Sequence, residues 1–229
     1  MRLLFALAAA VAVFVSFAAL SPLVVTFFIP LTVLCTFGSC WKNSESWLEH
    51  GIIVASVAGY TLAAFLLVLF ISGGFARIIF AATAASLLLL FLLIRFPLAS
   101  LFFYAVSLCF LGAGLLGFVH ILGMNSAAAT LAFMGGATAT MALAMVRGSE
   151  LPRLPDLGLA IALLTETFVV LLTLPLAIQV SGALLALAAS VLLLVSGALR
   201  ESLGDPRILR RHVISSALLA TLLLATARW

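Results

Sequence analysis

Glu166 is the residue of this sequence with the clearest capacity for chemistry, because it is the only acid in the apolar run LGLAIALLTETFVVLLTLP at residues 157–175. A carboxylate at mid-membrane costs roughly 2.5–3.5 kcal/mol on insertion scales, so such residues usually face a bundle interior or a cavity. Thr165 and Thr167 flank Glu166, and Thr173 follows about two turns along the same helical face. We therefore expect a polar pocket in which Thr173 helps to bind a ligand. Glu166 would be its catalytic, proton-handling group beside a quinol, the coupling group of a carrier, or a neutral acid hydrogen-bonded between helices.

His120 lies within the expected membrane span 97–123. It shares a helical face with Cys109 and with small residues that allow another helix to pack closely. Near the membrane edge it could bind a ligand, through a quinone carbonyl, or contact a partner helix. No haem is expected, because bis-histidine ligation needs two facing histidines, and His50 and His212 lie in or beside loops.

The segment NSAAATLAFMGGATATMALAM (125–145) carries a stripe of threonines and methionines on one helical face, with a glycine pair at its midpoint. The stripe consists of Thr130, Met134, Thr138, Met141 and Met145. Close helix packing explains this pattern, and the lining of a cavity for an apolar ligand is the alternative.

The stretch CWKNSESWLEHGII (40–53) is polar by the standard of this chain. Its two tryptophans are typical of aromatic anchors at a membrane interface. Ser46 precedes an apolar run, and Glu49 follows it by three residues, which is the spacing of a helix capping box. We expect a helix to begin here.

Composition limits the class of protein that can hold these residues. The 229-residue chain is 66% hydrophobic and 8% charged, with a mean hydropathy of +1.40, whereas a soluble domain is roughly one quarter charged. We predict an all-α, polytopic bundle of transmembrane helices that forms one integral membrane domain over residues 1–229. The net charge of +4 then indicates topology and lipid contact, not nucleic-acid binding. The three cysteines fit no metal-ligand spacing, so no metal site is expected.

Spans of about 20 apolar residues are expected at 48–72, 76–95, 97–123, 126–146, 157–179, 181–199 and 209–227. The segment 3–38 is long for one span and short for two, and it contains Ser21-Pro22 at its centre. Since proline suits the first turn of a new helix, two helices are slightly favoured. The prediction is eight or nine spans and no extramembrane domain.

The distribution of basic residues predicts the orientation, because lysine and arginine concentrate in cytoplasmic loops. Either span count places the loops 147–156 and 200–212 in the cytoplasm of a multi-pass protein in the cell or inner membrane. The second of these loops holds a basic cluster that could contact a partner or anionic lipid headgroups. The cluster consists of Arg200, Arg207, Arg210 and Arg211.

Three segments resemble the NrfD/DmsC-like membrane anchors of DMSO-reductase-type molybdenum enzymes. They are NSESWLEHGII, NSAAATLAFMGGATATMALAM and LLLVSGALRESLG, about 50 residues in all. The resemblance implies a haem-free integral subunit that holds iron–sulfur and molybdopterin subunits on the membrane and exchanges electrons with a quinol. It also implies that Ser46, Glu49 and His50 lie near the quinol-binding helix entry.

The sequence is therefore consistent with two functions. The first is an anchor subunit of a multi-subunit redox complex, not catalytic alone, that exchanges electrons and protons with a quinol or quinone. It is favoured by short loops and by the lack of a self-contained active-site motif. The second is a proton-coupled transporter of a small solute or ion that uses Glu166. Carriers of this kind often show inverted repeats, and the sequence contains no convincing repeat.

Overall fold

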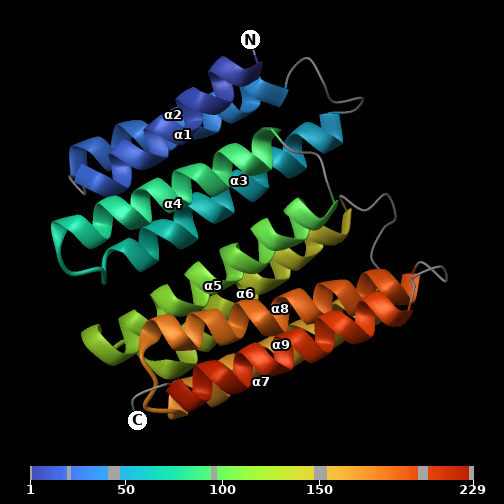
Figure 1. The fold of residues 1–229 in the computed structure, drawn as a ribbon. Helices are drawn as coiled ribbons and strands as arrows, with labels where there is room; N and C mark the ends of the chain where they lie inside the picture. The colour runs from blue at the N-terminus through green and yellow to red at the C-terminus, as the bar shows by residue number, and fades with distance from the viewer. Residues whose placement is uncertain are drawn as a thin grey trace. The chain divides into compact units, whose positions relative to one another are not determined.

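The computed structural model describes residues 2–19, 22–40, 47–93, 97–146, 154–200 and 206–226, and within these ranges the chain forms nine helices and no strand (Figure 1). The helices are α1 Arg2–Ala19, α2 Pro22–Cys40, α3 Trp47–Val68, α4 Gly74–Leu93, α5 Pro97–Leu122, α6 Ser126–Val146, α7 Leu154–Thr173, α8 Ile178–Arg200 and α9 Pro206–Thr226. The all-α prediction is confirmed for this part of the chain. The segment 3–38 forms two helices, and Pro22 is the first residue of the second, where its missing N–H costs no helical hydrogen bond.

Four helical segments are long and apolar enough to cross a membrane: Gly51–Val68, Gly74–Leu93, Phe102–Leu122 and Ser126–Ala144. Shorter apolar helical segments lie at Leu3–Ala19, Leu157–Thr173, Ile178–Leu193 and Val213–Thr226. Together with the composition, these segments indicate a membrane protein.

Glycines lie in two of the turns between helices: Gly73 directly precedes α4, and Gly123 directly follows α5. Gly73 has φ 98° and Gly123 has φ 69°, a left-handed conformation that glycine adopts without steric cost. In the first of these turns, Arg77 Nε donates a 2.9 Å hydrogen bond to the carbonyl of Ile71, which lies beyond the end of α3. In the second, Asn125 Oδ1 accepts a 2.8 Å bond from the N–H of Ala127 and so caps the start of α6.

The expected span 157–179 is wrong as a single helix. α7 ends at Thr173, and α8 begins at Ile178. Pro175 lies between them and cannot donate a helical hydrogen bond, and its ring disfavours the helical conformation of the residue before it. The N–H of Leu176 instead donates to the carbonyl of Leu174 at 2.8 Å.

The chain divides into two compact units, Met1–Phe103 and Tyr104–Trp229. In the first unit, α1 packs on α2 and α4. Its core includes an aromatic cluster in which the ring of Phe103 stacks on Tyr60 at 4.6 Å and on Phe91 at 3.8 Å between centroids. The buried Tyr60 hydroxyl donates a 2.9 Å hydrogen bond to the carbonyl of Ala84, joining α3 to α4.

In the second unit, α7 packs between α6 and α8, and α8 also packs on α9. The fully buried rings of Phe133 and Phe168 stack nearly parallel, 4.3 Å apart, and join α6 to α7. Residues of α5 approach α8 closely at Gly182, where an added Cβ would lie 2.8 Å from Ala113 Cβ and 3.1 Å from the carbonyl oxygen of Cys109. This unit contains Glu166 and the helices that position it.

Candidate functional site

Glu166 lies on the exposed side of α7. Leu164 and Phe168, two residues to either side, are fully buried in the second unit. Since successive residues of a helix are about 100° apart, a residue midway between two buried ones projects to the opposite side. The acid was expected to face a bundle interior or a cavity. It faces away from the unit's core, into a pocket on its surface.

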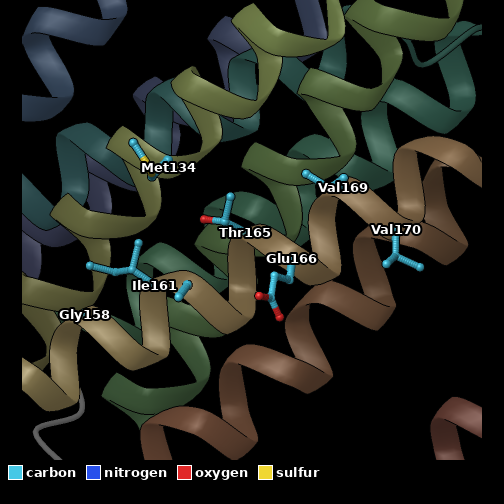
Figure 2. Close-up of a pocket in the computed structure, with 8 residues that line it drawn as sticks. Met134, Gly158, Ile161, Thr165, Glu166, Val169 and Val170 are labelled. Atoms are coloured by element: carbon cyan, nitrogen blue, oxygen red, sulfur yellow. The ribbon is translucent and has the colours of Figure 1, made fainter.

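This first pocket has a volume of about 640 Å³ and is lined by Met134 of α6 and by seven residues of α7 (Figure 2). The α7 residues form two neighbouring rows at four-residue spacing. The outer row is Gly158, Ala162, Glu166 and Val170, all exposed, and the row nearer α6 is Ile161, Thr165 and Val169. Glu166 is the only ionisable group among these eight residues. Within the part of the chain that the structure describes, its carboxylate has no hydrogen-bond or ion-pair partner.

Thr165 provides the second polar group of the pocket. Its Oγ1 is buried and lacks a hydrogen-bond partner among the described residues. The neighbouring hydroxyl of Thr167, by contrast, donates to the carbonyl of Leu163 at 2.8 Å. In Figure 2 the Thr165 hydroxyl points toward the side of α7 on which Met134 lies, whereas the Glu166 carboxylate points away from Met134.

A second pocket of about 470 Å³ continues along the same two helices. Val169 lines both pockets, and the other lining residues are Ser126, Ala127, Thr130 and Leu131 of α6 and Leu172 and Thr173 of α7. We call the two pockets together the α6–α7 groove. Thr173, a predicted ligand-binding residue, lies in this second pocket, and its hydroxyl donates to the carbonyl of Val170 at 2.7 Å.

The threonine–methionine stripe of α6 is divided between the groove and the core. Thr130 and Met134 line the groove, and the Met134 side chain is 41% exposed. Met141 is fully buried. Thr138 donates a 2.7 Å hydrogen bond to the carbonyl of Met134. Both expectations for the stripe, close packing and cavity lining, therefore apply to different residues of it.

Of the other predicted site residues, those whose side chains are described do not line the groove. His120 is exposed near the end of α5. Ser46 lies outside the described residues, and Glu49 and His50 belong to α3 but their side chains are not among those described. In the basic cluster, the side chains of Arg210 and Arg211 are exposed on α9. Arg200 ends α8 and Arg207 is the second residue of α9, and their side chains lie outside the described ones.

Sequence reasoning missed the apolar wall of the groove. The rows that contain Gly158 and Ile161 follow from the helical period, so they could have been predicted from α7 alone. That Met134 and Thr165 line the same pocket could not have been predicted, because it depends on how α6 and α7 pack. Among the described residues, no group of three or more His, Cys, Asp or Glu side chains could hold a metal ion.

Comparisons of the chain with protein-family models, with curated proteins and with solved structures give no match. The case for a function therefore depends on the chemistry of the groove and on the membrane character of the helices.

Proposed function

We propose that the protein is an integral membrane subunit of a multi-subunit redox complex, and that a quinol binds in the α6–α7 groove. The observation that carries the proposal is the exposed carboxylate of Glu166 within an otherwise largely apolar pocket on the outer face of α7. A carboxylate on the outside of a membrane helix is costly in contact with acyl chains. An amphiphilic ligand or a partner subunit at this face would remove that contact.

The proposed topology has eight or nine spans, with the loops 147–156 and 200–212 in the cytoplasm and no extramembrane domain. The nine helices of the described residues, eight of which contain an apolar segment, and the asymmetric distribution of arginines support it. The basic cluster around Arg210 and Arg211 then lies at the cytoplasmic surface, where it contacts anionic lipid headgroups or a partner subunit.

The chemistry of the groove supports the binding of a quinol. A quinol combines an apolar tail with a ring that carries two hydroxyl groups. The first pocket offers the ring an acid and a hydroxyl. The second pocket shares Val169 with the first and offers the tail a largely apolar surface along α6 and α7. Sites for small molecules are commonly apolar with a few well-placed polar groups.

Glu166 serves as the proton acceptor in this proposal. Oxidation of the quinol breaks two O–H bonds and releases two electrons and two protons. The carboxylate of Glu166 would accept the proton of the ring hydroxyl that it contacts and pass it to water, and the proton of the other hydroxyl would pass to water directly. The two electrons would go to the iron–sulfur subunit that the sequence resemblance implies. A molybdopterin subunit would be the final acceptor, as the sequence resemblance to NrfD/DmsC-like anchors implies.

The first test is the composition of the native complex. The protein is extracted from its membranes in mild detergent, and everything that travels with it is identified by mass spectrometry. Stoichiometric iron–sulfur or molybdopterin subunits, or bound quinone, support the proposal. A chain isolated alone, or only with copies of itself, contradicts it.

The second test is Glu166→Gln in that complex. Loss of a general base slows proton transfer by roughly 100-fold or more, so quinol oxidation should fall by that factor while the complex stays assembled. Glu166→Asp, which keeps the carboxyl group, should retain part of the rate. If the purified chain instead moves protons or a solute across liposomes and Glu166→Gln abolishes this, the protein is a proton-coupled carrier.

A further inference from the structure

Thr165 is unusual among the described threonines of the chain. Threonines in helices commonly bond the carbonyl three or four residues earlier, and this bond is made by Thr130, Thr138, Thr167 and Thr173 in the same two helices. Thr165 Oγ1 makes no such bond, although it is buried. Among the buried side-chain nitrogen and oxygen atoms of the described residues, only this one lacks a partner.

The position of this hydroxyl places it in the proposed quinol site. Thr165 lies between Ile161 and Val169 in the row of α7 nearer α6, and all three residues line the first pocket. Its Oγ1 points toward the Met134 side of α7 in Figure 2. Met134 lines the same pocket and is 41% exposed, and methionine is flexible and adapts to the shape of a ligand, so this wall of the pocket can move as a ligand enters.

Thr165 and Glu166 cannot serve the same ligand atom well. Successive side chains diverge by about 100° around a helix, and these two belong to different rows of the pocket. A ring that carries oxygen atoms at opposite ends can contact both. The pair therefore fits a ligand with two separated oxygen atoms.

We propose that the Thr165 hydroxyl binds one ring oxygen of the quinol or quinone, while Glu166 binds the other. This inference rests on the proposed quinol-binding function of the groove. A hydroxyl donates and accepts, so Thr165 can bond the oxygen of either redox form, whereas a carboxylate only accepts and can bond only the hydroxyl of the reduced form. Thr165 thus holds the ring in both states, and Glu166 gives preference to the quinol.

The experiment measures equilibrium binding of decylubiquinone and of its reduced form to the purified native complex. Loss of one hydrogen bond of about 1.4 kcal/mol corresponds to a tenfold change in Kd. Thr165→Val, which replaces the hydroxyl by a methyl group, should weaken binding of both forms about tenfold. Thr165→Ser restores the hydroxyl and should bind nearly as the native protein does. Glu166→Gln should weaken the reduced form more than the oxidised form.

Thr167→Val is the matched control, because Thr167 is two residues away and its hydroxyl bonds its own helix outside the pocket. The thermal midpoint without ligand adds a second readout. Since Thr165→Val removes an unpaired buried hydroxyl, its thermal midpoint should equal or exceed that of the native protein. A loss of affinity without a fall in the midpoint is then a loss of binding, not of folding. If Thr165→Val binds both forms with native affinity, or loses no more affinity than Thr167→Val does, the role of Thr165 is overturned while the quinol function of the groove still stands. Failure of the native complex to bind either probe overturns the quinol function itself.

Discussion

Gly182→Ala tests the packing that supports the second unit. Gly182 lies on α8, the helix that packs against α7. An added Cβ would lie 2.8 Å from Ala113 Cβ and 3.1 Å from the carbonyl oxygen of Cys109. Ordinary carbon–carbon contacts are 3.5–4.0 Å, so α5 and α8 would have to separate by about 1 Å. Neither neighbour can rotate away, because one is backbone and the other is a Cβ.

The expected loss of stability combines two opposing effects. Overpacking a close-packed contact costs roughly 1–3 kcal/mol. Replacing glycine by alanine within a helix stabilises the fold by about 1 kcal/mol, because alanine has the higher helix propensity. The net effect of Gly182→Ala is therefore a destabilisation of about 0–2 kcal/mol.

Gly135→Ala on α6 is the control, because a Cβ at Gly135 meets nothing within 4 Å. This variant should gain about 1 kcal/mol from helix propensity alone. The two variants then differ by about 1–3 kcal/mol, or several degrees in thermal midpoint at about 2–4 °C per kcal/mol. The midpoints are measured in one detergent at one protein concentration. A midpoint for Gly182→Ala equal to or above that of Gly135→Ala would show that α5 and α8 do not meet at this residue.

Two further predictions concern the groove and the packing of α6 on α7. Val169→Trp fills the junction of the two pockets, so long-tailed quinols should lose affinity by about tenfold more than tailless analogues; equal losses for both would show that the tail does not lie along the second pocket. Phe133→Leu and Phe168→Leu each remove one ring of the stack between α6 and α7, and a double-mutant cycle on thermal stability should give a coupling of about 0.5–1.5 kcal/mol. Additive effects of the two substitutions would contradict the stacked geometry.

The helical fold could be predicted from the sequence to a large extent, because composition and helix-breaking residues determine it locally. Pro22, expected to begin a second helix within 3–38, is the first residue of α2. The helix expected over 157–179 ends at Thr173, because Pro175 cannot donate a helical hydrogen bond although the apolar run continues past it. Where composition and backbone chemistry disagreed, the backbone determined the result.

The candidate site could be predicted only in part. Glu166 stood out because it interrupts an apolar run, and Thr173 because it lies seven residues further along the helix. The direction of the Glu166 side chain was harder to predict. A helix buries one face, and the sequence does not say which apolar residues form that face. Phe168 and Leu164 are buried, so Glu166 is not. The unpaired hydroxyl of Thr165 depends on its rotamer beside α6 and has no signature in the sequence.

The exposure of Glu166 places the same requirement on both functions considered for this protein. A charged carboxylate in hydrocarbon costs roughly 2.5–3.5 kcal/mol on insertion scales, and no described residue of the chain offers Glu166 a hydrogen bond or an opposite charge. The compensating group must therefore come from a bound ligand, a partner subunit, a proton or water. A purely structural role leaves only protonation to remove the charge. A carrier that works alone must bring water or its solute to the outer face of α7, whereas a complex can cover that face with a quinol or another subunit. The exposed position of Glu166 on α7 is therefore the observation on which the proposal of a larger assembly rests.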